Sequence, residues 1–194
     1  MRLFRPIYDR VLLWSRHRHA RRYLGVLSFA ESVFFPIPPD VMLAPMVLAR
    51  RDEAWSLALL TTVTSVLGGL AGYLIGWLAL DLVFPLVERV GYVDEYFSAV
   101  EMFETWGIAF VIVAGFTPIP FKIITIAGGA LLMPLPAFVL GCVIGRGARF
   151  FLVAGLIRAG GERMAEQLRD WVDALGWLVV GVVAIAAIIL GVRG

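Results

Sequence analysis

The chain has 194 residues, of which 60% are hydrophobic and only 16% are charged, and its mean hydropathy is +0.87. This composition excludes a soluble globular protein and indicates a polytopic membrane protein that forms one compact domain. The formal net charge is +2, and the single cysteine, Cys142, has no second cysteine with which to form a disulfide.

Positive charge is concentrated at the beginning of the chain. Residues 1–22 contain seven arginines and one aspartate, with apolar residues at roughly helical spacing among them. This pattern predicts an Arg-rich amphipathic segment on the cytoplasmic surface of the membrane, and no cleavable signal peptide. Nucleic-acid binding is a poorer interpretation, because arginines next to a membrane segment are more simply a topology signal facing anionic lipid.

A proline-rich break, "FFPIPPD" at residues 34–40, interrupts the first apolar stretch. The apolar runs 23–35 and 41–49 on either side would form helices of about 20 and 14 Å, and neither alone crosses a hydrocarbon core of ~30 Å. Arginine pairs flank both ends of the stretch, which favours a re-entrant hairpin over residues 23–49 rather than a crossing. The prolines expected at its tip are Pro36, Pro38 and Pro39.

A spanning helix is predicted over residues 54–80. It carries Gly68, Gly72 and Gly76 at four-residue spacing, which predicts a face for close helix packing. Residues 81–106 contain six acidic residues and only one arginine, so we expect an outer segment that lies along the interface.

The pattern then repeats, 82 residues after the first break, with "FTPIPFK" at residues 116–122. We predict a second re-entrant hairpin over residues 107–132 with Pro118 and Pro120 at its tip. A second spanning helix over residues 137–158 follows, with Gly141 and Gly145 as its packing positions.

The predicted fold is therefore an all-α polytopic membrane protein with an inverted repeat of two Pro-broken re-entrant hairpins. Each hairpin is followed by a Gly-rich transmembrane helix, as in transporters that build a site near the bilayer midplane. The hairpins and spans form a membrane domain over residues 23–175, and residues 176–194 form a C-terminal transmembrane helix. The arginine distribution predicts a cytoplasmic N-terminus and a periplasmic C-terminus.

Charged side chains at membrane depth are costly, so they are the first candidates for a functional site. Glu31 is a candidate proton carrier, because desolvation favours the neutral form of a carboxyl group. Asp40 could cap the helix that follows it or belong to the site. These charged positions are Glu31, Asp40, Lys122, Arg146 and Arg149.

The three basic positions suit an anionic ligand. Lys122 lies in the first turn of a predicted helix, where the helix dipole disfavours a cation unless an anion is near. Its partner is either Asp40 or Glu31 in a structural ion pair, or an anionic ligand. Arg146 and Arg149 are three residues apart on one helix face, where bidentate donors could bind phosphate; for Arg149, snorkelling to the interface is the alternative.

Motifs of other functional classes are absent from the sequence. There is no Walker sequence, no G-x-S-x-G and no Cys/His metal spacing, and no nucleophile–base set is visible. We therefore expect neither an enzyme nor a metal or other cofactor.

Three stretches together resemble the DedA family, which carries the VTT or SNARE-associated Golgi protein domain, and in particular its YqaA-like branch. They are "FAESVFFPIPPDVMLAP", "SVLGGLAGYLIGW" and "GFTPIPFKIITIAGGALLMPLPAFVLGCVIGRGARF", and the resemblance covers roughly residues 25–158. It implies paired re-entrant hairpins and movement of phospholipids or polyprenyl-phosphate carriers between leaflets. Bacterial members are tied to the proton motive force and to envelope integrity.

The resemblance carries over to individual positions only in part. Glu31 and Asp40 match the two membrane-embedded acids of the family's first hairpin. Its second hairpin resembles Arg-x-x-Pro-x-x-Arg, but here Gly115 and Phe116 stand where the first arginine is expected, and Lys122 lies close to the second. Arg146 or Arg149 could compensate for the missing cation.

The leading hypothesis is a lipid translocase of the bacterial inner membrane, flippase- or scramblase-like, that moves a phosphate-headgroup lipid with or without proton coupling. Lys122, Arg146, Arg149 and Asp40 would bind the headgroup, and Glu31 and Asp40 would exchange protons. The alternatives are a non-transporting scaffold for envelope integrity and a proton-coupled transporter of a small solute. The expected partners are membrane lipids, with a homo-oligomer left open.

Overall fold

The computed structural model describes residues 17–35, 37–91, 93–117 and 121–161. Several predicted features lie outside these residues: most of the Arg-rich segment, the C-terminal span at 176–194, and Pro36, Pro118 and Pro120. The described parts of the chain are helical, and none of them forms a β-strand.

Two short helices lie on either side of the first break. Helix α2 (Ala20–Val33) ends just before the prolines, and α3 (Asp40–Ala49) begins directly after Pro39. Proline has no N–H and disfavours a helical conformation in the residue before it, which explains why no helix continues through this segment. A 3-10 turn, η1 (Arg51–Glu53), then leads into the long helix α4 (Ala54–Val90).

The same order recurs after a turn at Gly91, whose φ of 81° suits glycine. Helix α5 (Val93–Phe116) ends before the second break, α6 (Phe121–Ala130) begins after it, and a helix over Leu135–Gly161 follows. Helix–break–ten-residue helix–long helix is therefore the pattern of both halves of the described chain.

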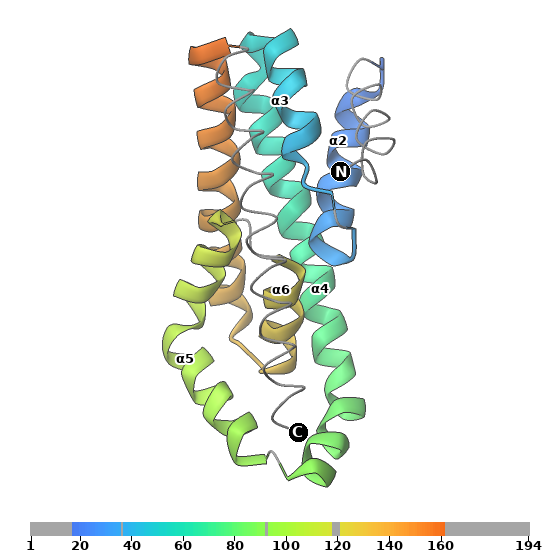
Figure 1. Ribbon diagram of the computed structural model, residues 1–194, viewed down its shortest axis with the longest axis vertical. Helices are drawn as coiled ribbons and strands as arrows, with labels where there is room; N and C mark the ends of the chain where they lie inside the picture. The colour runs from blue at the N-terminus through green and yellow to red at the C-terminus, as the bar shows by residue number, and fades with distance from the viewer. Residues whose placement is uncertain (1–16, 36, 92, 118–120, 162–194) are drawn as a thin grey trace, which may run out of the picture.

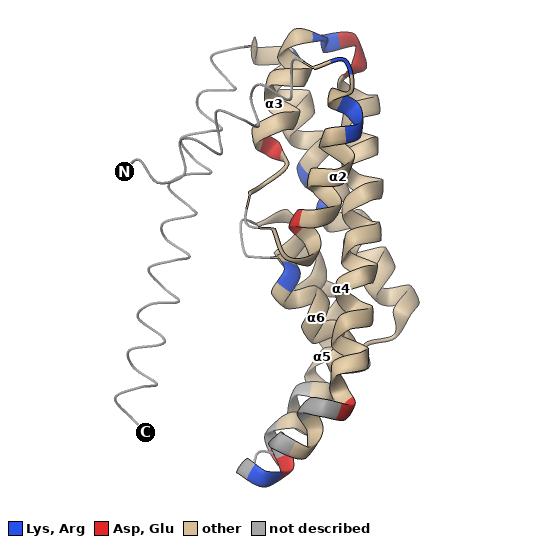
Figure 2. Ribbon diagram, turned by 90° about the vertical axis from the view of Figure 1, so that its right-hand side faces the viewer, with Lys and Arg blue, Asp and Glu red and all other residues tan. Residues whose placement is uncertain are grey.

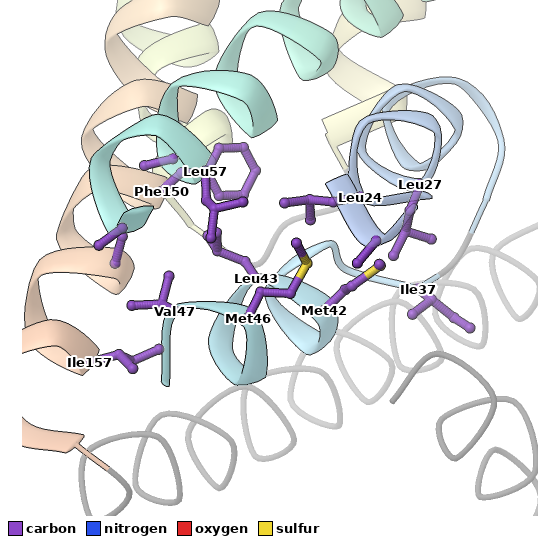
Figure 3. Close-up of a cluster of buried hydrophobic side chains, with 14 residues drawn as sticks. Leu24, Leu27, Ile37, Met42, Leu43, Met46, Val47, Leu57, Phe150 and Ile157 are labelled. Atoms are coloured by element: carbon purple, nitrogen blue, oxygen red, sulfur yellow. The ribbon is translucent and has the colours of Figure 1, made fainter. Parts of the chain in front are cut away.

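The two long helices, α4 and Leu135–Gly161, run side by side in opposite directions along the molecule (Figure 1). Helices α2 and α3 lie beside one half of their length, and α5 and α6 lie beside the other half. Each half of the bundle's length has its own apolar core. The core around α3 includes Leu24, Leu43, Leu57, Phe150 and Ile157 (Figure 3), and the core around α6 includes Val66, Val111, Phe121, Phe138 and Cys142.

Three helical segments are long and apolar enough to cross a membrane: Arg51–Asp81, Tyr96–Phe116 and Leu135–Gly161. Helices α3 and α6 have ten residues each, which is about 15 Å of helix and too short to cross. The chain is thus a helical, multi-pass membrane protein.

The helix boundaries differ from the predicted ones in the middle of the chain. Residues 81–106, expected as one outer segment, are divided between the end of α4 and the first half of α5. Helix α4 continues through Pro85 to Val90, and α5 is 24 residues long, whereas the sequence suggested that the apolar arm begins at residue 107. Tyr96–Phe116 is consequently a candidate span that the sequence prediction did not contain.

Close contacts between helix backbones hold the bundle together at glycine positions. A side chain at Gly76 would overlap the carbonyl oxygen of Ile126 in α6, and one at Gly129 would overlap that of Tyr73 in α4. The other predicted packing glycines also face neighbouring helices: Gly68 faces α2, Gly72 faces α6, and Gly141 and Gly145 face α5.

Candidate functional site

Charged residues from both halves gather midway along the molecule, where α2 ends and α3 and α6 begin (Figure 2). The two arginines come from the Leu135–Gly161 helix, three residues apart and therefore on one face of it. Each of them pairs with a carboxylate beside the first break: Arg146 with Glu31 of α2, and Arg149 with Asp40 of α3.

Arg146 is almost fully enclosed. Its side chain is 2% exposed and forms an ion pair with Glu31 near the end of α2. Its Nε donates a hydrogen bond to Ser65 Oγ of α4 at 2.6 Å, and that oxygen lies 2.8 Å from Ser32 Oγ. The rings of Phe121 and Phe150 cover the guanidinium, each with its centroid 4.8 Å from Cζ. Hydrogen bonds, an opposite charge and cation–π contacts thus offset the desolvation of Arg146.

Arg149 joins the two breaks. Its Nη2 donates to Asp40 Oδ2 at 2.6 Å, and its Nη1 donates to the carbonyl oxygen of Thr117 at 2.9 Å. Asp40 is the first residue of α3, and Thr117 directly follows α5. The side chains of Arg149 and Asp40 are 12% and 9% exposed, so this pair is less enclosed than Arg146. The other carboxylate oxygen, Asp40 Oδ1, is buried without a hydrogen-bond partner among the described residues.

Asp40 does not act as the helix cap that the sequence suggested as one option. The Met42 and Leu43 amides donate to the carbonyl oxygen of Pro39, and α3 has no side-chain cap. The carboxylate still lies in the first helical turn, where the dipole of α3 favours a negative charge.

Lys122, in the first turn of α6, contacts the carboxyl end of α2. Its Nζ donates to the carbonyl oxygen of Phe34, 3.3 Å away, at the carboxyl end of α2. The carboxyl end of α2 carries a partial negative charge, and this charge offsets the unfavourable position of a cation in the first turn of α6. None of the ion pairs found in the described part of the chain includes Lys122, so neither Asp40 nor Glu31 is its partner there.

The sequence indicated all five charged residues, and the structure brings them into one region. It did not indicate the uncharged groups that complete the region: Ser32, Ser65, Thr117, Phe121 and Phe150. Ser65 lies among the small residues of α4, and a hydroxyl in such a packing stripe is a signal that could have identified it. Among the described residues, no group of His, Cys, Asp and Glu could hold a metal ion.

The arrangement can bind anions. Three cations and two carboxylates meet within it, so the formal charge of the region is one positive unit when all five groups are ionised. A phosphate oxygen could replace a carboxylate oxygen as the acceptor of an arginine without loss of hydrogen bonds.

Comparison with known proteins places the chain in a family. The model of the VTT domain matches residues 35–159. The chain is 44% identical over 190 residues to an uncharacterised protein of Haemophilus influenzae, covering 98% of this chain and 99% of that protein. It is 39% identical over 190 residues to an uncharacterised protein of Histophilus somni, covering 98% and 100% of the two chains.

A more distant relative is an uncharacterised protein of Methanocaldococcus jannaschii, 28% identical over 134 residues, which are 68% of this chain and 81% of that protein. No solved structure matches the chain. The family match covers both breaks and both arginines. The chain therefore belongs to the VTT-domain, or DedA, family of membrane proteins.

Proposed function

We propose that this protein moves a phosphate-headgroup lipid between the leaflets of the bacterial inner membrane, with its N-terminus in the cytoplasm. The observation that carries the proposal is the buried charged region between the two breaks, which has one more cation than it has carboxylates. A phosphodiester headgroup carries one negative charge and would neutralise that excess. Membership of the protein in the VTT-domain family supports a transport role.

The Asp40–Arg149 pair is the better exchange point for a headgroup. Arg149 uses one donor on a backbone carbonyl at a break and another on a single carboxylate oxygen. A phosphate could accept from Arg149 in a bidentate arrangement and displace Asp40, which would then take up a proton or turn away. Lys122, whose only polar contact among the described residues is a carbonyl oxygen at 3.3 Å, would be a second donor to the headgroup.

Transport of a fluorescent phospholipid in proteoliposomes tests the proposal. Relative to the parent, Lys122→Ala and Arg149→Gln should each slow flipping by about tenfold or more, since each loses a charge-assisted hydrogen bond to the headgroup worth at least about 1.4 kcal/mol. Asp40→Asn should also slow flipping, because it removes the carboxylate that competes with the phosphate for Arg149 and so helps to release the phosphate. Arg50→Gln is the matched control, because Arg50 forms an exposed pair with Glu53 at the end of the bundle. Parent-like flipping by folded Lys122→Ala, Asp40→Asn and Arg149→Gln would reject the site.

A non-transporting scaffold is the second hypothesis, because every partner of Arg146 and Arg149 is supplied by the protein itself. A reversed pair, Asp40→Arg with Arg149→Asp, separates the two. If the pair is structural, the reversed protein should fold and complement a deletion strain. If Arg149 binds the headgroup, the reversed protein should fold but flip no lipid.

A further inference from the structure

An apolar groove with a basic end lies on the surface between α2 and α4, away from the charged pairs in the interior. Its volume is about 360 Å³. The arginines lie at the first turn of α2, and the apolar residues follow along the same helix toward its middle. The groove is lined by Arg21, Arg22, Gly25, Val26, Phe29, Leu60 and Thr64.

The residues of α2 that line the groove share one helix face. Positions 25 and 26 are each three or four residues from both 22 and 29, so the four form a continuous stripe along α2. Gly25 forms the floor, where an added Cβ would lie 3.3 Å from the methyl carbon of Thr64. Val26 and Phe29 are 68% and 40% exposed, so the described residues leave this apolar stripe uncovered.

The described residues neutralise the charges at the groove's end only in part. Arg21 donates to Glu53 at 3.5 Å and to Ser56 at 3.3 Å, and Glu53 also pairs with Arg50. The side chain of Arg22 is exposed and makes no hydrogen bond or ion pair with the described residues. Arginines therefore outnumber the acids there, at the end of α4 where the positive-inside pattern predicts the cytoplasmic interface.

We propose that this groove binds one anionic phospholipid, with its phosphate on Arg21 and Arg22 and an acyl chain along Val26 and Phe29. The order of chemistry along the groove, cationic at the predicted interface and apolar toward the bundle middle, matches the order along an anionic lipid. The bound lipid bridges α2 and α4, and it holds in place the helix that carries Glu31. The proposal does not depend on lipid transport, because the groove shares no residue with the central charged region.

Lipid retention by the purified full-length chain in detergent tests the proposal. Titration with dioleoyl phosphatidylglycerol and dioleoyl phosphatidylcholine, followed by native mass spectrometry, should give tighter binding of the anionic lipid. The double variant Arg21→Gln/Arg22→Gln should weaken phosphatidylglycerol binding by about tenfold or more. Gly25→Leu should also weaken phosphatidylglycerol binding, because its side chain fills the groove. Val26→Trp should weaken it too, and because this side chain covers the groove from its exposed edge, it does not disturb the contact between α2 and α4.

Two controls separate this groove from other sites. Arg50→Gln/Arg51→Gln removes the same charge from the same end of the molecule outside the groove and should leave binding within about twofold. Arg149→Gln tests the central site separately: the fall in phosphatidylglycerol binding caused by Arg21→Gln/Arg22→Gln should be as large in the Arg149→Gln background as in the parent, and its disappearance there would overturn the proposal. Equal binding of both lipids would overturn it as well. So would a groove-filling variant that turns a dimer into a monomer without affecting lipid, which would assign the groove to a second copy of the chain.

Discussion

Arg146 and Arg149 are one helical turn apart, yet their surroundings differ. Arg146 has an acid, a hydroxyl and two aromatic rings around it and is 2% exposed. Arg149 has an acid and a backbone carbonyl and is 12% exposed. The more enclosed arginine joins α2, α4 and the Leu135–Gly161 helix, so we infer that it fixes the bundle, whereas Arg149 is the arginine that a headgroup could reach.

Loss of Arg146 should therefore lower the free energy of unfolding considerably. Arg146→Met leaves Glu31 as an unpaired, mostly buried carboxylate, and breaking a buried pair in this way typically costs about 3–5 kcal/mol. Thermal or denaturant unfolding in detergent measures this loss. Arg50→Met, which removes an exposed pair, should cost no more than about 1 kcal/mol. Glu31→Leu combined with Arg146→Met should recover most of the stability; a single variant as stable as the parent would contradict a structural role.

The charged residues of the site could be predicted from sequence because charge in an apolar chain is conspicuous. Their pairing could not, because it depends on how the Leu135–Gly161 helix is rotated against the first hairpin. The sequence left Asp40, Glu31 and an anionic ligand open as the partner of Lys122. In the structure, Arg149 from a neighbouring helix reaches Asp40 instead.

Helix boundaries could be predicted from sequence where prolines interrupt the helices, but not where charge was the only guide. Prolines fixed the breaks, so the predicted runs on either side of the first break correspond closely to α2 and α3. Residues 81–106 were predicted as an outer segment because of their acidic residues, although apolar residues recur in them at helical spacing. Phe103, Gly107, Val111 and Ala114 recur at helical spacing and are buried, while Glu101 and Glu104 are exposed. That stripe indicates the length of α5 better than charge does.

Close backbone packing of α4 against α6 makes Gly76 the most size-restricted position of the predicted glycine face. Gly76→Ala places a methyl group against the Ile126 carbonyl oxygen, so we expect α6 to be displaced and stability to fall by about 1–3 kcal/mol. Gly147→Ala is the matched control. Its Cβ would lie 3.6 Å from a methyl carbon of Thr62, an ordinary contact, and alanine favours a helix by about 0.5–1 kcal/mol over glycine. Equal unfolding midpoints for the two variants would refute the packing account.

The two halves of the chain contact each other through both polar and apolar groups. Arg149 of the second half binds Asp40 of the first, and Lys122 of the second half binds the carbonyl end of α2. Apolar contacts join the halves as well: Phe150 and Ile157 of the second half pack in the core around α3, and Val66 of the first half packs in the core around α6. The charged region therefore lies between two apolar cores that both halves of the chain build together.

The charge distribution over the whole molecule predicts its orientation. Arg21, Arg50 and Arg51 lie at the end where α4 begins, and the turn between α4 and α5 is acidic, so Asp52 should face the cytoplasm and Asp94 the periplasm. Cysteines introduced at 52 and 94 in a Cys142→Ser background can be labelled with a membrane-impermeant maleimide. In spheroplasts, position 94 should react at once and position 52 only after permeabilisation. Reversed labelling would show that the protein has the opposite orientation. Labelling of both positions from one side would contradict a crossing by α4.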